Sequence, residues 1–130
     1  MDKCARKSRD IEFFSEKNQR IICVHSQSAR QYARYLEEQD WVTKYETCIP
    51  LDQARYGNIN PVDIRQAYFQ ESWATDFLLH YADGHCGVRE LADAAELSRR
   101  AKIEQLEFSR RYWSVMDVAE WKVVLEEAHG

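Results

Sequence analysis

An Asp-Gly pair between two apolar runs is the feature that most constrains the fold of this chain. The segment "TDFLLHYADGHCGVRELA", residues 75–92, carries it at positions 83 and 84. Asp-Gly flanked by apolar residues predicts an antiparallel hairpin. With a three-residue loop at 82–84 and Gly84 in the left-handed conformation, Tyr81 pairs with His85.

The length of this loop decides where the two carboxylates of the hairpin lie. The loop at 82–84 places Asp76 opposite Glu90, and side-chain alternation puts Ala92 on the same face. A loop at 83–85 makes Asp76 face Ala92 instead, with Glu90 diagonal to it. A two-residue loop separates Asp76 and Glu90 onto opposite faces. An odd-length loop is therefore the condition for a joint site.

Two carboxylates on one sheet face, about 5 Å apart, repel each other unless a cation, a base or raised pKa values relieve them. Oxygen ligands of this kind favour Mg²⁺ or Mn²⁺, which can polarise a phosphate and activate water. Asp76 and Glu90 are therefore the predicted metal ligands. A lysine two residues after Glu90 would complete the site, but Ala92 stands there. Lys102, on the following helix, is a replacement within reach, whereas Arg89 points to the other face.

The rest of the chain alternates strand and helix patterns around this hairpin. Ser26 or Ser28 can cap the first helix, whose apolar stripe contains Ala29. Residues 54–61 read as a loop, and 62–70 read equally well as a strand or a short helix. The other predicted elements are strands at 11–14 and 20–25, helices at 28–39 and 93–116, a strand at 41–51 and a buried strand at 121–125. This order predicts an α/β domain with a mixed β-sheet flanked by helices.

The domain organisation follows from length and composition. A chain of 130 residues with 45% hydrophobic residues suits one domain, assigned to residues 11–130. Residues 1–10 read as a flexible basic arm that contacts a DNA backbone or is simply solvated. The basic residues of this arm are Lys3, Arg6, Lys7 and Arg9.

The charge of the chain limits how it can meet nucleic acid. The net charge of −4 counts against strong non-specific binding but leaves room for a local basic patch. On the 93–116 helix, Arg99 and Arg110 lie on nearly one azimuth beside Lys102, a stripe suited to phosphate contacts. Glu104 and Glu107 intersperse it, so an ion-paired solvated face is the competing interpretation. The acidic pair at 37–38 reads as a solvent face.

The cysteines and the apolar stretches bear on compartment. Cys4, Cys23, Cys48 and Cys86 form no CxxC pair, and no apolar leader precedes them. Free thiols in the cytoplasm are the expectation, with no membrane-spanning segment. At the hairpin tip the sequence "HYADGHC" gathers two histidines, an aspartate and a cysteine, which either form a polar tip or bind zinc.

The stretch from residue 13 to residue 52 resembles the opening of the TnsA-type endonuclease domain. The matching residues are Ser15, Lys17 and Asn18; Ser26; Leu36 and Glu37; and Val42, Tyr45 and Glu46. Further along, "TDFLLHYADG" is similar to the family's PDF-type strand and turn. The segments "VRELADAAEL", "RRYW" and "WKVVLEE" are similar to its second metal-site strand, long helix and closing strand.

The resemblance implies a restriction-endonuclease-like fold and Mg²⁺-dependent DNA cleavage as one subunit of a heteromeric transposase. The family's aspartate falls on Asp76 and its second strand position on Glu90. Its lysine falls on Ala92, and its helix glutamate falls on Ala29, or on Gln31 if Ser28 is the aligned serine. Two of four active-site groups are thus missing, and each such loss typically costs about 3–4 kcal/mol of transition-state stabilisation.

Three functions follow as hypotheses. The first is a catalytically impaired TnsA-like protein of a mobile element, acting in transposition and DNA recombination through DNA or a transposase subunit. The second is an active Mg²⁺-dependent endonuclease with a rearranged site of Asp76, Glu90 and Lys102. The third is an acidic accessory or inhibitor protein that binds another protein and never contacts DNA.

Overall fold

The computed structural model describes residues 10–126, so the basic side chains of Lys3, Arg6, Lys7 and Arg9 lie outside the described part. The strands are β1 (Ile11–Ser15), β2 (Arg20–Val24), β3 (Val42–Pro50), β4 (Ala74–Tyr81), β5 (Cys86–Asp93) and β6 (Glu120–Glu126). The α-helices are α1 (Gln27–Glu37) and α2 (Arg100–Ser114), and short 3₁₀ helices are η1 (Gln53–Asn58), η2 (Gln66–Gln70) and η3 (Glu96–Ser98).

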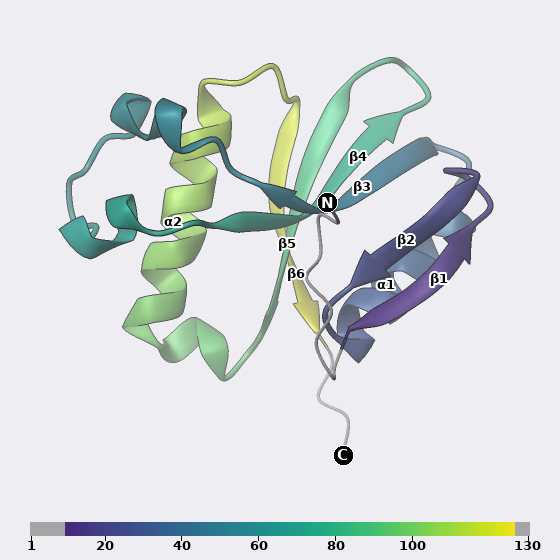
Figure 1. Ribbon diagram of the computed structural model, residues 1–130, viewed down its shortest axis with the longest axis horizontal. Helices are drawn as coiled ribbons and strands as arrows, with labels where there is room; N and C mark the ends of the chain where they lie inside the picture. The colour runs from purple at the N-terminus through teal and green to yellow at the C-terminus, as the bar shows by residue number, and fades with distance from the viewer. Residues whose placement is uncertain (1–9, 127–130) are drawn as a thin grey trace.

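Four strands form one mixed sheet in the order β3-β4-β5-β6, and β1 and β2 form a separate hairpin. Neighbours are antiparallel except β5 and β6, which are parallel because α2 carries the chain back between them. In Figure 1, α2 and the 3₁₀ helices lie on one side of the sheet, and α1 with the β1–β2 hairpin lies on the other. The predicted α/β class and mixed sheet are confirmed.

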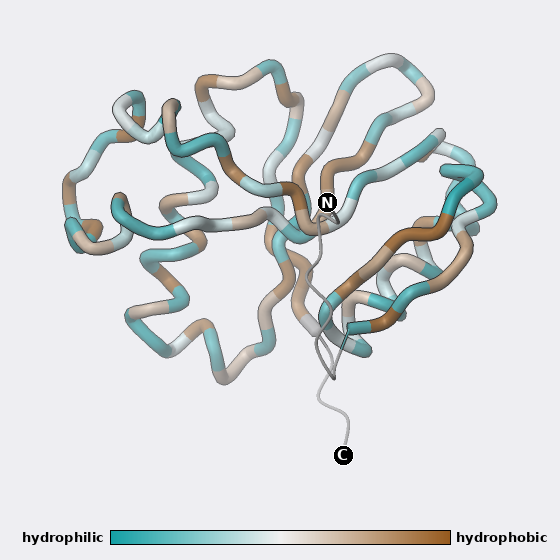
Figure 2. The backbone as a smooth tube through the Cα atoms, viewed as in Figure 1, coloured by the Kyte–Doolittle hydropathy of each residue, from teal (hydrophilic) through white to brown (hydrophobic). Residues whose placement is uncertain are grey.

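The two sides of the sheet bury separate apolar clusters. The first cluster joins α1 and β2 to the sheet through Ala33, Leu36, Phe77 and Leu79, all of which are fully buried. The apolar stripe predicted for the first helix is therefore correct, and Ser26 caps this helix by accepting from the Ala29 N–H. Figure 2 shows hydrophobic stretches running along the central strands and β2, with hydrophilic turns between them.

The second cluster explains the segment 52–72, which the sequence left undecided. This segment contains η1 and η2, which place Tyr56 and Tyr68 against Phe108 and Trp113 of α2. The rings of Tyr56 and Phe108 meet edge-on at 4.9 Å. Because aromatic burial dominates here, the segment needs neither a long helix nor a strand to be ordered.

Two sequence predictions are wrong in detail. The long helix begins at Arg100, since residues 96–98 form the separate turn η3, and Ile103 on its expected apolar face is 50% exposed. The closing strand β6 is not a buried strand, because it pairs only with β5 and Leu125 is 58% exposed. An edge strand with one covered face needs fewer buried residues than a central one.

No helix in the described range 10–126 combines the length and the apolar character that crossing a membrane requires. The prediction of no membrane-spanning segment agrees with this finding. The described cysteines, Cys23, Cys48 and Cys86, are free thiols, as expected from their spacing.

Candidate functional site

The β4–β5 hairpin has the register that the three-residue loop predicts. Phe77 pairs with Arg89 and Leu79 pairs with Gly87. Gly84 has a φ of 91°, the left-handed conformation that only glycine adopts without strain. The other two registers are thereby excluded, and Asp76 and Glu90 occupy corresponding positions on the two strands.

The two strands part at Asp76 and Glu90, where side chains replace the regular backbone ladder. The Asp76 N–H donates to Glu90 Oε1 at 3.0 Å, and the Leu91 N–H donates to Asp76 Oδ2 at 2.8 Å. On the β3 side, Cys48 lies at the corresponding position with a φ of 52°, a left-handed conformation that interrupts a regular strand. Both carboxylates therefore satisfy main-chain donors that the separated strands leave over.

Glu90 is also held from α2, which packs across the split. Ser109 Oγ donates to Glu90 Oε2 and accepts a hydrogen bond of 3.0 Å from Trp121 Nε1. The residue Glu90 is only 6% exposed. Each of its two carboxylate oxygens thus has a protein donor, which leaves few lone pairs for a ligand.

The electrostatics of the pair follow from burial and proximity. Burial, together with the negative charge of Asp76, raises the pKa of Glu90 to about 7. Burial also raises the pKa of Asp76, opposed by the Leu91 N–H and by the positive charges of Lys102 and His25. The two carboxyls titrate as a coupled pair, and near neutral pH they share less than two full negative charges.

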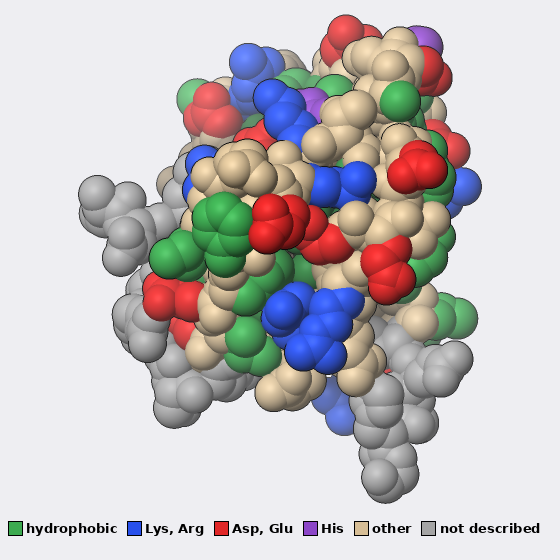
Figure 3. Space-filling view, turned by 90° about the vertical axis from the view of Figure 1, so that its right-hand side faces the viewer, with side chains coloured by type: hydrophobic (Ala, Val, Ile, Leu, Met, Phe, Trp, Pro, Cys, Tyr) green, Lys and Arg blue, Asp and Glu red, His purple; other side chains and the backbone are tan. Residues whose placement is uncertain are grey.

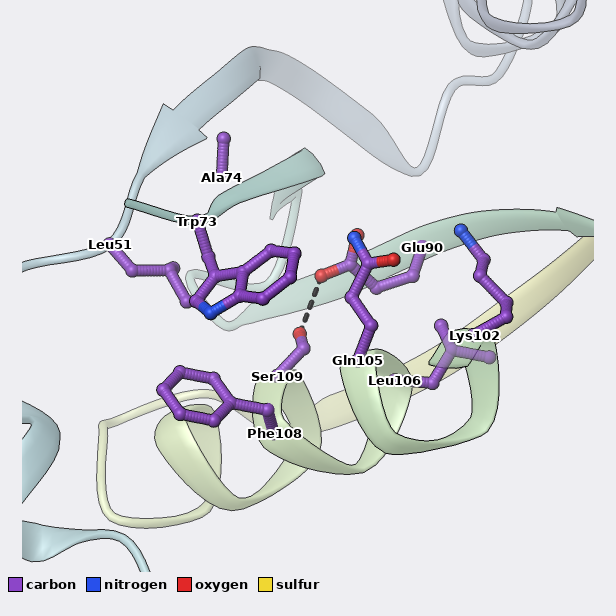
Figure 4. Close-up of a pocket in the computed structure, with 9 residues that line it drawn as sticks. All are labelled: Leu51, Trp73, Ala74, Glu90, Lys102, Gln105, Leu106, Phe108 and Ser109. Atoms are coloured by element: carbon purple, nitrogen blue, oxygen red, sulfur yellow. Dashed lines mark hydrogen bonds between the residues drawn. The ribbon is translucent and has the colours of Figure 1, made fainter. Parts of the chain in front are cut away.

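Lys102 lines a small cavity beside Glu90, as the sequence suggested (Figure 4). The cavity lies between β5 and α2, with Trp73 and Gln105 in its wall, and its volume is about 10 Å³. That is about the space one water molecule needs. Lys102 Nζ is 4.0 Å from Glu96 Oε2, so its charge is shared with an acid outside the carboxylate pair.

The positions where the family's remaining active-site groups would fall carry alanines inside the protein. Ala92 is fully buried and Ala29 is 7% exposed. Because Ser26 is the N-cap of α1, Ala29 is the third residue of the helix, and the alignment through Ser26 matches the helix start. Gln31, the alternative, is exposed. Neither buried alanine can hold a metal ion or a phosphate oxygen.

The predicted phosphate-contacting arginines of the second helix differ in their surroundings. Arg110 donates from Nε and one terminal nitrogen to Glu107, so it belongs to the ion-paired face. Arg99 is exposed and precedes the helix rather than lying on its stripe. The competing interpretation, an ion-paired surface, therefore describes Arg110 better than a phosphate contact does.

The residues that carry the family resemblance in the first third of the chain meet in one polar network. The Glu37 carboxylate accepts from Ser15 Oγ at 2.6 Å, from Tyr45 Oη and from the Lys17 N–H. Asn18 Oδ1 accepts from the Tyr45 N–H at 3.0 Å. The prediction of a solvent-facing Glu37 is wrong, because this carboxylate joins the β1–β2 turn to α1 and β3.

A basic hollow lies next to this network and was not recognised in the sequence. Lys17, Arg20 and Lys44 line an open hollow of about 420 Å³. Asn18 also lines it, and its buried Nδ2 has no hydrogen-bond partner among residues 10–126. The three cations are 27 positions apart at the extremes, so only the pairing of β1, β2 and β3 gathers them. Figure 3 views the side on which β1, β2 and α1 lie, where basic and acidic patches alternate.

No protein-family model matches this chain, and no curated protein matches it either. The similarity to the TnsA-type domain thus rests on the residues quoted above and on their order along the chain.

Proposed function

We propose that this chain is a TnsA-like endonuclease-fold protein of a mobile element that is impaired in cleavage and acts through DNA or a transposase subunit. The observation that carries the proposal is the use of both carboxylates by the fold itself. Asp76 and Glu90 bind main-chain amides at the strand split and Glu90 also binds Ser109. Mg²⁺ would have to displace these donors before it could bind a phosphate.

The missing groups support the same conclusion. Ala92 and Ala29 leave the carboxylates without the lysine and the acid that the resemblance implies, and both positions are closed to solvent. Losing two charge-stabilising groups, each worth roughly 10²–10³ in rate, leaves little cleavage to observe.

We expect the purified chain to leave supercoiled plasmid intact in Mg²⁺ or Mn²⁺, at a rate no different from its Asp76→Ala variant. Gel electrophoresis of nicked and linear products measures this. Calorimetric titration of both proteins with Mn²⁺ serves as the companion measurement, because binding does not depend on a partner subunit. Metal-dependent nicking that Asp76→Ala abolishes would contradict the impaired-site proposal.

One observation favours the second candidate, an active nuclease with a rearranged site. Lys102 lines the same cavity as Glu90, and its charge lowers the pKa of Asp76. A lysine in this place can stabilise charge on a phosphate that reaches Asp76. If nicking is found, Lys102→Ala should abolish it, while Lys122→Ala, on the exposed side of β6, should retain it.

For the contact with DNA, we propose the basic hollow formed by Lys17, Arg20 and Lys44. Arg20 and Lys44 are exposed, and Lys17 Nζ donates to the Gln39 carbonyl at 2.8 Å, which fixes one cation at the rim. Cations around an open hollow match the spacing of phosphate oxygens better than the ion-paired Arg110 does.

The double variant Arg20→Glu, Lys44→Glu should bind duplex DNA at least about tenfold more weakly than the native chain at low salt. Its salt dependence should be shallower by about one log unit per lost phosphate contact. Fluorescence anisotropy with a labelled duplex at several salt concentrations measures both quantities. Arg55→Glu, on η1 on the far side of the sheet, is the control and should bind like the native chain. Equal loss in both variants would assign the effect to net charge alone.

A further inference from the structure

A second group of metal-binding side chains lies at the open end of the β1–β2 hairpin. Cys23 and His25 are two residues apart, so they project from the same face of the chain where β2 ends. Asp10 precedes β1 and lies across from His25, because Ile11 pairs with Val24. One ligand atom from each of the three residues lies within 4.8 Å of the other two, and all three residues are partly exposed.

The three donors are a thiol sulfur, an imidazole nitrogen and a carboxylate oxygen, which is a set that zinc prefers and magnesium does not. Zinc bonds of about 2.0–2.3 Å in a tetrahedral site place neighbouring ligand atoms about 3.2–3.8 Å apart. His25 Nδ1 and Asp10 Oδ1 are 2.7 Å apart, so an ion would need to spread this pair by about 1 Å. His25 is 40% exposed in its side chain, so it has room for that movement.

The position of Cys23 is fixed by the neighbouring strand. Its carbonyl accepts from Thr47 Oγ1 of β3 at 2.8 Å and from the Cys48 thiol at 3.6 Å. A ligand on a held strand loses little conformational entropy when it binds a metal ion.

The hairpin tip offers a contrast with the same residue types. There His80 lies between its neighbours, with Nε2 2.8 Å from Glu46 and Nδ1 3.4 Å from Cys86. Its two nitrogens point in different directions, so thiol and carboxylate bond opposite edges of one ring. A single ion cannot bind all three, whereas Asp10, Cys23 and His25 converge.

We propose that Asp10, Cys23 and His25 form a three-ligand site for Zn²⁺, with a fourth position open to water or to another ligand. The ion would join the start of β1 to the end of β2, on the side of the sheet that carries α1. This site is independent of the Asp76–Glu90 pair and of any nuclease activity.

Titration of the chelator-treated protein with Zn²⁺, in competition with a chromophoric chelator, tests the proposal. We expect one ion per chain and a dissociation constant below about 1 µM, given the strength of thiolate-imidazole sites. Cys23→Ser and His25→Ala should each weaken binding more than about 100-fold, since loss of even an outer-shell partner costs 10–100-fold. The matched variants Cys86→Ser and His80→Ala should bind zinc like the native chain.

Substitution with Co²⁺ gives a second readout that needs no variant to fold. A thiolate-to-cobalt charge-transfer band should appear in the native protein and in Cys86→Ser, and it should be absent in Cys23→Ser. Lack of this band in the native protein would overturn the proposal. Loss of zinc affinity in Cys86→Ser or His80→Ala, with Cys23→Ser unaffected, would overturn it as well by placing the ion at the hairpin tip.

Discussion

Replacing Glu37 with alanine should lower the free energy of unfolding by about 3 kcal/mol. The change removes the acceptor of Ser15 and of Tyr45, both fully buried, and of the Lys17 N–H. Buried donors left without a partner cost about 1–3 kcal/mol each, and partial rescue by water reduces the sum. Urea denaturation followed by tryptophan fluorescence measures the loss.

The adjacent Glu38 supplies the matched control. It is exposed and follows the last residue of α1, so Glu38→Ala should change the free energy of unfolding by less than about 0.5 kcal/mol. A similar loss in both variants would mean that helix termination, rather than the polar network, is responsible. Tyr45→Phe, which removes one donor and keeps the acceptor, should fall between the two.

The pKa of Glu37 gives the network a second signature. Burial by itself raises this pKa, but the hydrogen bonds from Ser15, Tyr45 and the Lys17 N–H outweigh it and hold the pKa below its ordinary value. The stabilisation by Glu37 is therefore present at neutral pH and is lost as pH falls through the lowered pKa. The difference between native chain and Glu37→Ala should shrink under acid conditions.

Replacing Glu90 with glutamine should make the protein more stable at pH 8 and should flatten the dependence of its stability on pH. The pKa of Glu90 rises from 4.5 to about 7 on folding, which corresponds to on the order of 3 kcal/mol. Because the folded pKa lies above the unfolded one, this stability is fully present below pH 4.5 and is lost as pH rises through about 7. Glutamine never ionises, yet its oxygen can still accept from the Asp76 N–H.

Denaturation curves at several pH values between 4.5 and 8 test this difference, with the native chain losing stability relative to Glu90→Gln across that range. Glu107→Gln is a control of opposite sign. Hydrogen bonds from Arg110 and Arg111 lower the pKa of Glu107 to about 2, so its contribution is present at neutral pH and fades in acid. Parallel curves for the native chain and Glu90→Gln would show that Glu90 is not the titrating group.

The hairpin shows what local chemistry can predict. Gly84 in the left-handed conformation fixes a three-residue loop, the loop fixes the register, and the register places Asp76 opposite Glu90. Each step depends on neighbours within a few positions along the chain. The same holds for α1, whose apolar stripe and Ser26 cap lie within one short segment.

The uses of these residues depended on partners far away along the chain. The two hydrogen bonds that link Asp76, Glu90 and Leu91 replace a strand ladder, which no local pattern reveals. Glu37 looks like a surface acid by its neighbour Glu38, but the β1–β2 turn folds over it. Burial of such a group is a property of the assembled chain.

The sequence by itself determined the order of the elements, the α/β class and the pairing of the central hairpin, because periodicity and turn chemistry act locally. Tertiary structure alone decided that the carboxylate pair is enclosed by α2, that the lysine nearest to it is Lys102, and that Asp10 meets Cys23 and His25. Ionisation and metal binding depend on which charges and donors lie within a few ångströms and on how much water is excluded. Those distances exist only after strands and helices from separate parts of the chain have packed together.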